Sequence, residues 1–238
     1  MLTKSKLKIY QQLRLKKFRQ KYGLFVVEGL KSVNELVNST WPLEQVICSS
    51  SFSAENSDVL NKGSIVIDDQ DFKTVSQLST PSGILAVAKY HSLKVEQSKW
   101  QIAIDGISDP GNFGTILRIA DWYGINTIYC SEDTVDQYNA KSIISSMGSF
   151  LRVKVIRGNL EMLVKNKQVY ATMLEGEDFR KTSVSNQGIL MIGSESRGIS
   201  KKLLSVISHK QITIPNSGGA ESLNAAMATA ICCERFFG

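Results

Sequence analysis

The second half of the chain carries three polar clusters, and each of them follows an apolar run of residues. The first cluster, Asp109-Pro110-Gly111-Asn112, is a turn sequence that leads into a predicted helix carrying Arg118. An arginine among apolar helix residues extends its head group to water or pairs with an acid. A helix cap followed by a turn explains the cluster equally well, so by itself it indicates little about function.

The second cluster runs from Gly193 to Gly198 and contains Glu195 and Arg197. It lacks the Lys-Ser/Thr pair of a phosphate-binding P-loop, and the G-x-G-x-x-G pattern of dinucleotide sites is absent as well. We therefore interpret it as a ligand loop of nucleotide type without phosphate chemistry. Glu195 is expected to be buried or half-buried, and it then needs a positive partner, either Arg118 or Arg197.

The third cluster joins a Gly-Gly turn to the start of the last helix, which is predicted over 222–236. Ser222 is the predicted N-cap of this helix. Asn224 would then lie inside a helix rich in alanine, where asparagine has a poor propensity. A buried asparagine needs hydrogen-bond partners, so a ligand or a backbone carbonyl is expected beside it.

Composition narrows the class of protein before any element is assigned. The 238 residues are 42% apolar and 21% charged, which excludes a disordered or collagen-like chain and fits one large domain or two small ones. The net charge of +6 permits a polyanionic partner without requiring one. Two histidines and four cysteines without metal-ligand spacing leave little material for a zinc site or a Ser-His-Asp triad. We expect no metal and a reducing compartment.

The first 22 residues are predicted to form one basic helix. Its charges are either a solvated face or a contact to RNA phosphates, and the sequence favours neither. This segment lacks the apolar stretch of a signal peptide, and no run of 18 apolar residues occurs in the chain. We therefore expect a cytoplasmic protein without a membrane segment.

Short apolar runs alternate with helical patterns, which predicts an α/β fold with mostly parallel sheets. In the first half we expect a helix over 30–39, another starting near Asp68, and strands over 24–28, 45–48, 64–67 and 83–89. In the second half we expect strands over 101–104, 127–130, 151–155, 169–172, 189–192 and 211–214. Helices are expected there over 113–124, 139–147, 158–166, 200–207 and 222–236.

The polar stretch 91–99 is the predicted linker between a domain over 1–90 and a domain over 100–238. The last helix is apolar around much of its circumference and rich in small residues. Such a helix belongs in the core or against a second subunit.

Taken in order, the three clusters resemble the three motifs of the SpoU (TrmH-type) branch of the SPOUT RNA 2′-O-ribose methyltransferases. The matching stretches are DPGNFGTILRIADWYG, LMIGSESRGIS and ITIPNSGGAESLNAAMATAI. The stretch FVVEG and the basic residues before it resemble the small N-terminal substrate-binding domain of the family. The resemblance covers nearly the whole chain. It departs from the family pattern at DWYG, where a smaller residue more often precedes the aromatic one, and at Cys232-Cys233.

The resemblance implies a parallel sheet with a C-terminal trefoil knot, preceded by a small α/β substrate-binding domain. It implies a homodimer that needs no metal. The implied cofactor is S-adenosylmethionine, and the residues expected to contact it are Gly193, Ile214 and Leu223. The implied catalytic positions are Asn112, Arg118, Glu195, Ser222 and Asn224.

The family also suggests a role for each of these catalytic positions. Arg118 would either activate the ribose 2′-hydroxyl or, because arginine stays protonated, bind the neighbouring phosphate and lower the pKa of the hydroxyl electrostatically. Ser222 would help to hold that phosphate, and Glu195 would orient Arg118. Asn112 and Asn224 would position backbone and substrate.

The expected activity is methyl transfer from S-adenosylmethionine to a ribose 2′-hydroxyl of structured RNA. The separate N-terminal domain favours 23S rRNA over tRNA as the substrate. The alternatives are a tRNA ribose methyltransferase, a tRNA guanosine-N1 methyltransferase of the same superfamily and a non-catalytic RNA-binding relative. An unrelated α/β metabolic enzyme would need a phosphate or dinucleotide fingerprint, and the sequence has none.

Overall fold

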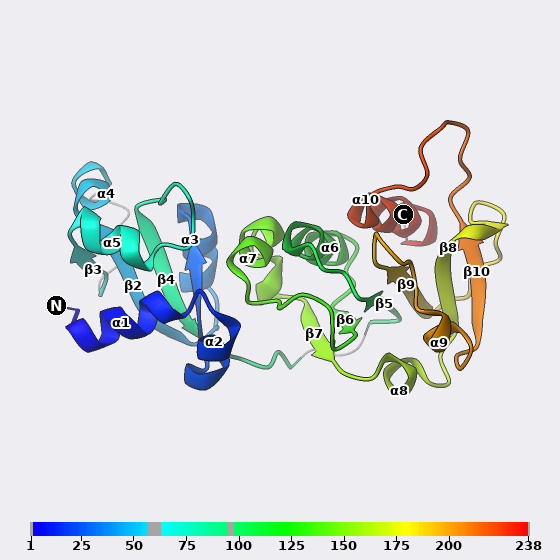
Figure 1. Ribbon diagram of the computed structural model, residues 1–238, viewed down its shortest axis with the longest axis horizontal. Helices are drawn as coiled ribbons and strands as arrows, with labels where there is room; N and C mark the ends of the chain where they lie inside the picture. The colour runs from blue at the N-terminus through cyan, green and yellow to red at the C-terminus, as the bar shows by residue number, and fades with distance from the viewer. Residues whose placement is uncertain (1, 57–62, 95–97, 238) are drawn as a thin grey trace.

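The computed structural model describes residues 2–56, 63–94 and 98–237 (Figure 1). Two sheets are formed by separate stretches of the chain, the first between residues 24 and 89 and the second between residues 100 and 213. The predicted linker 91–99 falls between them, and its residues 95–97 lie outside the described part. The division into domains over 1–90 and 100–238 stays a prediction.

The first sheet has the strand order β1-β4-β2-β3 and is mixed. Antiparallel pairing joins β4 to both β1 and β2, whereas β2 and β3 are parallel neighbours. The expectation of a mostly parallel sheet is wrong here, because β4 enters in the reverse direction between two strands that run the same way. The strands are β1 (Leu24–Glu28), β2 (Leu43–Ser49), β3 (Ile65–Ile67) and β4 (Ile84–Lys89).

The basic N-terminal segment forms two helices, and the prediction of one helix is wrong. α1 ends at Gln12 with the fully buried Leu13 as its C-cap, and Leu15 is extended before α2 begins. Burying Leu13 against the first sheet turns the chain, so the charges of the segment are divided between two helices. The helices of this half are α1 (Lys4–Gln12), α2 (Lys16–Tyr22), α3 (Leu30–Val37), α4 (Ser50–Glu55) and α5 (Asp69–Val75).

The second sheet is entirely parallel, with the order β10-β8-β9-β5-β6-β7, which confirms the predicted α/β fold with a parallel sheet. Its strands are β5 (Trp100–Asp105), β6 (Thr127–Cys130), β7 (Lys154–Arg157), β8 (Val169–Asp178), β9 (Gly188–Gly193) and β10 (His209–Thr213). The strand expected over 151–155 starts later, because a 3-10 turn, η1 (Ser149–Leu151), precedes it. The helices are α6 (Pro110–Trp122), α7 (Ala140–Ser146), α8 (Leu160–Val164), α9 (Lys201–Leu204) and α10 (Ala225–Phe237).

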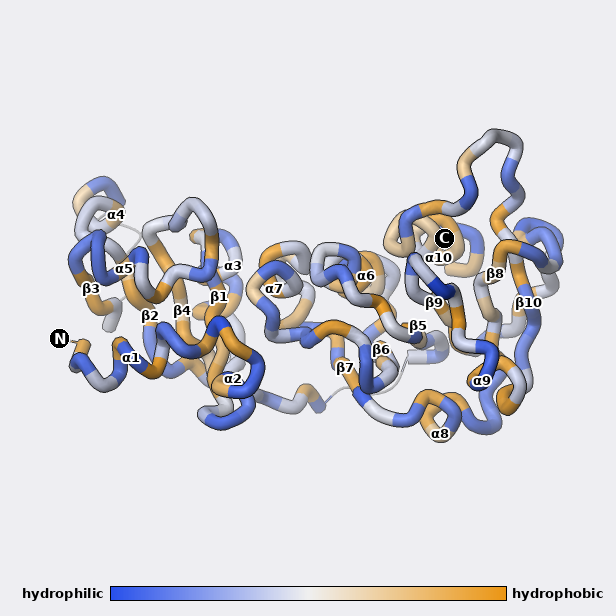
Figure 2. The backbone as a smooth tube through the Cα atoms, viewed as in Figure 1, coloured by the Kyte–Doolittle hydropathy of each residue, from blue (hydrophilic) through white to orange (hydrophobic). Residues whose placement is uncertain are grey.

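The last helix lies in the core, as predicted, and Figure 2 shows it as an apolar element beside α6. It is shorter at its start than expected, because it begins at Ala225 and not at residue 222. Its buried side chains are Ala225, Ala226, Thr229, Cys232 and Cys233. Among the described residues, no helix is both long and apolar enough to span a bilayer.

Candidate active site

The carboxyl ends of β5, β9 and β10 face the same edge of the second sheet, because all of its strands are parallel. The segments that leave this edge are 106–109, 194–200 and 214–224, which carry the three polar clusters of the sequence. Open parallel sheets bind ligands at the carboxyl ends of their strands. The fold therefore brings the three clusters to the edge where a ligand site is expected.

The start of α6 is fixed by contacts of Asp109. One oxygen of its carboxylate accepts a hydrogen bond from the backbone N–H of Asn112 at 2.8 Å, as an N-cap does. The other oxygen lies 2.9 Å from Lys141 Nζ, and this hydrogen bond lowers the pKa of Asp109. Pro110 occupies the first helical position, where its missing N–H leaves no intrahelical bond unmade. These contacts fix the backbone that carries Asn112.

Asn112 connects the three loops through its side chain. Its Nδ2 donates a hydrogen bond to Glu195 Oε1, and its Oδ1 accepts one from Asn224 Nδ2 at 2.9 Å. A carboxamide can donate and accept at the same time, which a carboxylate cannot. The expectation of a buried Asn224 is wrong, because this residue is exposed, and the partner of its Nδ2 is the Asn112 side chain on α6 rather than the expected backbone carbonyl.

Glu195 is exposed, and the expectation that it would be buried is wrong. Its hydrogen-bond partner is the Asn112 amide rather than Arg118 or Arg197. An exposed carboxylate keeps its hydration and does not require a positive partner. The proposed orientation of Arg118 by Glu195 is accordingly not seen in this structure.

The turn that carries Glu195 is closed by its own backbone. The N–H groups of Ser194 and Gly198 each donate to the carbonyl of the other residue, at 3.1 and 2.9 Å. A side chain at Gly193 would place its Cβ 2.2 Å from the carbonyl carbon of Gly198, so only glycine permits this approach.

Two acidic residues that were not expected at the site, Asp105 and Asp133, hold this turn in place together with Arg197. Asp105, a buried acid at the end of an apolar strand, accepts a hydrogen bond from the Ser200 N–H at 2.7 Å. Arg197 pairs with Asp133, whose pKa is lowered by the Ser131 hydroxyl and by Arg197. The sequence holds one hint of these contacts, which is that the apolar strand β5 ends in an acidic residue, Asp105.

Arg118 lies on the exposed side of α6. Within residues 2–56, 63–94 and 98–237 its guanidinium makes no hydrogen bond or ion pair. A cation without an internal partner is available to an anionic ligand such as a phosphate.

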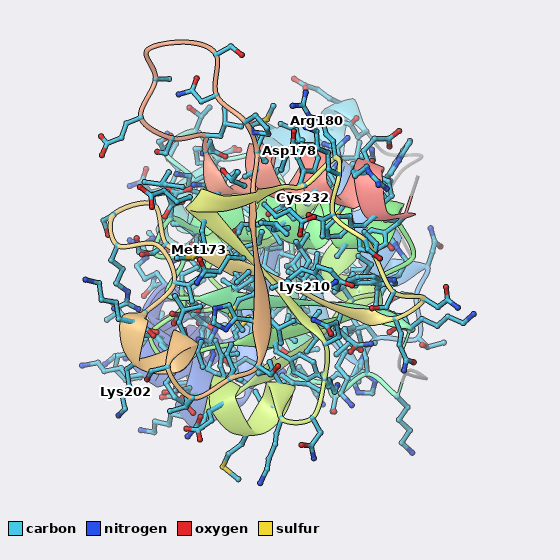
Figure 3. The ribbon with its side chains drawn as sticks, turned by 90° about the vertical axis from the view of Figure 1, so that its right-hand side faces the viewer. Met173, Asp178, Arg180, Lys202, Lys210 and Cys232 are labelled. Atoms are coloured by element: carbon cyan, nitrogen blue, oxygen red, sulfur yellow. The ribbon has the colours of Figure 1, made fainter. Side chains whose placement is uncertain are left out.

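The segment between β10 and α10 projects away from the sheet, as Figure 3 shows. Ser222 is exposed there, and the prediction that it caps the last helix is wrong. The cap is Asn224, whose Oδ1 accepts hydrogen bonds from the N–H groups of Ala226 and Met227 at 3.0 and 3.3 Å. The side chain just before the helix is the one that reaches these two donors.

The residues expected to contact the cofactor lie at the ends of β9 and β10 and just before α10. Ile214 is half-buried and Leu223 is 49% exposed, so both offer apolar surface at this edge. Such surface fits an adenine ring, and a loop without a P-loop lysine fits a cofactor without phosphate. No group of three or more His, Cys, Asp or Glu side chains in the described part of the chain could hold a metal ion.

A parallel sheet that gathers three polar loops at the carboxyl ends of its strands defines an α/β protein with a ligand site at that edge. The SpoU rRNA Methylase family matches residues 99–234, and the MRM3-like substrate binding domain matches residues 4–86. The chain belongs to the SpoU rRNA methylase family, which confirms the resemblance seen in the three motifs.

Relatives match along nearly the whole length of the chain. The 23S rRNA (guanosine(2553)-2′-O)-methyltransferase RlmP of Bacillus subtilis is 29% identical over 95% of this chain and 93% of its own length. A TrmH-family protein from Porphyromonas gingivalis superposes with a TM-score of 0.85 and 30% identity, covering 99% and 98% of the two chains. An AdoMet-bound rRNA methyltransferase from Sinorhizobium meliloti superposes with a TM-score of 0.82 and 25% identity, covering 99% and 95%.

Proposed function

We propose that this protein transfers a methyl group from S-adenosylmethionine to a ribose 2′-hydroxyl of 23S rRNA. The observation that carries the proposal is the hydrogen-bonded chain from Glu195 through Asn112 to Asn224, which joins three separate loops at the ligand edge of the sheet. Membership of the SpoU rRNA methylase family and the similarity to a 23S rRNA 2′-O-methyltransferase support the reaction and the substrate class.

When bound, S-adenosylmethionine supplies a methyl group already activated by its sulfonium sulfur. The protein then has to hold the ribose oxygen in line with that methyl group, which is a task of positioning. Gly193, Ile214 and Leu223 form the cofactor side of the site. Asn112 holds the loops of Glu195 and Asn224 at one distance and thereby sets the place that the ribose occupies.

Arg118 acts on the RNA side of the site. Its guanidinium lacks an internal partner in the described residues, so it binds the phosphate next to the target ribose and stabilises negative charge that develops on the 2′-oxygen. As the oxygen–methyl bond forms, the methyl–sulfur bond would break and release the thioether product, and the hydroxyl proton would pass to solvent water. Ser222 is exposed on the neighbouring loop and contributes a hydroxyl donor to the same phosphate.

The assembly we propose is a homodimer in the cytoplasm, with the C-terminal segment threaded as the trefoil knot of the family. Support for the dimer comes from large apolar side chains that are exposed on the second half of the chain. They lie on α6, β8, the last loop and α10, and they are Trp122, Leu174, Leu223 and Met227. Within each chain we propose an RNA-binding domain over 1–90, a linker over 91–99 and a methyltransferase domain over 100–238.

The direct test is to map 2′-O-methylated positions in rRNA and tRNA from cells with and without the gene. Loss of one 2′-O-methyl group from 23S rRNA is the expected result. Mass analysis of the nucleosides separates the alternatives, because a guanosine-N1 enzyme would remove a base methylation and a non-catalytic relative would remove none. Loss of a tRNA methylation alone would replace 23S rRNA with tRNA as the substrate.

A further inference from the structure

Helix α2 belongs to the basic N-terminal segment, yet its arginine contacts the other half of the molecule. Arg19 is only 3% exposed. Its Nε and Nη2 lie 3.0 and 2.7 Å from Asp136 Oδ2, and its Nη1 donates to the carbonyls of Leu13 and Arg14. One guanidinium therefore joins the turn between α1 and α2 to the loop that precedes α7.

Asp136 also forms hydrogen bonds with α7 and with the residues just before it. Its Oδ1 accepts a hydrogen bond from the Tyr138 N–H at 3.3 Å, and its backbone carbonyl accepts one from Ser142 Oγ at 3.2 Å. Aromatic rings pack around the ion pair. The ring of Tyr138 lies with its centroid 4.4 Å from that of Phe25 on β1 and 4.2 Å from that of Tyr90. The seam between the two halves thus combines this ion pair with aromatic rings from both halves, and two of these rings, Tyr90 and Tyr138, also line a cavity.

Helix α7 in turn contacts the start of α6. Lys141 Nζ binds the Asp109 carboxylate that caps α6 ahead of Asn112. Further along, a Cβ at Gly114 would lie 2.4 Å from the Ser142 carbonyl oxygen, so the two helix backbones are nearly in contact. Figure 1 shows α7 between the first sheet and α6. Continuous contacts therefore run from α2 to the candidate active site.

We propose that Arg19 and Asp136 are positioning residues that hold the exposed lysines of α2 at a set distance from Asn112. RNA that binds those lysines would then present one particular ribose to the site. The inference rests on the proposed function, because it assigns a specificity role to contacts outside the methyl-transfer site. Lys16, Lys17 and Lys21 are exposed and have no acidic partner in the part of the chain that the structure describes.

A second ion pair crosses the same seam and provides a matched control. Arg152 Nη1 lies 3.2 Å from Glu35 Oε2 of α3, but the two side chains are 50% and 30% exposed, against 3% and 15% for Arg19 and Asp136. Exposed pairs contribute little to stability, whereas removing one partner of a buried pair leaves a charge without compensation. We therefore expect the buried pair of Arg19 and Asp136, but not the exposed pair of Arg152 and Glu35, to fix the distance between the two halves.

The experiment compares Asp136→Asn, Asp136→Ala and Arg19→Lys with Glu35→Gln in the full-length protein. Asp136→Asn leaves the contacts of Arg19 with Leu13 and Arg14 intact, so the N-terminal half keeps its own structure. Spin labels at Ala54→Cys and Glu161→Cys, both exposed and on opposite halves, report the distance between the halves by pulsed electron resonance, with labelled chains diluted in an excess of unlabelled protein so that distances within one chain dominate. The four native cysteines are buried and stay unlabelled.

We expect a narrow distance distribution in the parent protein and in Glu35→Gln, and a broad one in the Asp136 and Arg19 variants. On an in vitro transcript of 23S rRNA, these variants should lose roughly 10- to 100-fold in kcat/KM and methylate additional positions, because a displacement of about 1 Å is that costly. Affinity for S-adenosylmethionine, measured by calorimetry, should change less than twofold.

Three outcomes would overturn the proposal. One is a distribution that is already broad in the parent protein. Another is a narrow distribution that persists in Asp136→Asn, with the same methylated position and only a lower Tm, since that describes a purely structural pair. The third is a loss of kcat/KM in Glu35→Gln that equals the loss in the Asp136 and Arg19 variants. A parent protein that keeps the narrow distribution but methylates neither 23S rRNA nor tRNA contradicts the proposed function and leaves the rigid seam standing.

Discussion

Asn112 is the residue on which we propose that the arrangement of the candidate site depends, because its side chain hydrogen-bonds to Glu195 and to Asn224. We predict that Asn112→Ala lowers the methyl-transfer rate about a hundredfold, a typical cost for losing one positioned donor. Asn112→Asp should be no better, since it keeps the acceptor for Asn224 but places a second carboxylate beside Glu195. Single-turnover transfer of labelled methyl measures both. Asn112→Ala and Asn224→Ala should also be non-additive when combined, and full additivity would mean that their hydrogen bond plays no part.

We propose that Arg118 acts through its charge, because among the described residues no acid holds its guanidinium in one orientation. Arg118→Ala should reduce methyl transfer by about two to three orders of magnitude while affinity for S-adenosylmethionine stays nearly intact. Arg118→Lys should recover part of the rate, since a lysine supplies the same charge at a phosphate. Glu195→Gln should cost less than Arg118→Ala. A near-native rate for Arg118→Ala would move the search for the active group to Asn112, Ser222 and Asn224.

At the scale of elements, the closed turn 193–198 is the part of the site with the least tolerance. Gly193→Ala forces a Cβ against the Gly198 backbone, and we predict a loss of about 2–3 kcal/mol in the free energy of unfolding, together with weaker cofactor binding. Gly219→Ala is the control, because no atom lies within 4 Å of its added Cβ and the change should stay within about 0.5 kcal/mol. Urea denaturation compares the two, and equal stabilities would show that the turn can open without cost.

The basic N-terminal segment contains arginines that bind other parts of the protein and lysines that are exposed without an acidic partner in the described residues. Nη2 of the exposed Arg14 donates to the carbonyls of Thr74 and Ser76, and Arg19 is buried, so both are less free to reach phosphates than the lysines of α2. We predict that changing Lys16, Lys17 and Lys21 together to Gln reduces the slope of log K against log salt for RNA binding by roughly two. Arg14→Gln should leave the slope unchanged. If the slope is unchanged in the triple variant, these lysines do not contact RNA phosphates and only form a solvated surface.

For the whole molecule, we propose that a second copy of the chain covers the exposed apolar side chains of Trp122 on α6 and Met227 on α10. Sedimentation at micromolar concentration should therefore show a dimer. Met227 is the outward apolar residue of α10, at 58% exposure, and Met227→Glu should shift the protein to a monomer without changing its Tm by more than a few degrees. A parent protein that sediments as a monomer would argue against the dimer directly.

The order of elements in the second half, the three polar clusters and the family could be predicted from local sequence patterns. Hydrophobic periodicity, turn residues and motif spacing are local properties, and the parallel sheet followed from the alternation of strands and helices. Prediction failed where burial or a competing local contact intervened. The buried Leu13 divided the basic helix, and Asn224 rather than Ser222 supplied the cap of α10.

The pairing of polar side chains that are far apart in the sequence could be read only from the folded chain. Asn112 meets Glu195 and Asn224 across 83 and 112 residues of chain, and Arg19 meets Asp136 across 117. The tertiary structure also decided that β4 runs against β1 and β2, and that Glu195 is exposed while Arg19 is buried. Each of these outcomes depends on how separate elements pack, and a pattern that repeats every two to four residues holds no information about neighbours that far apart.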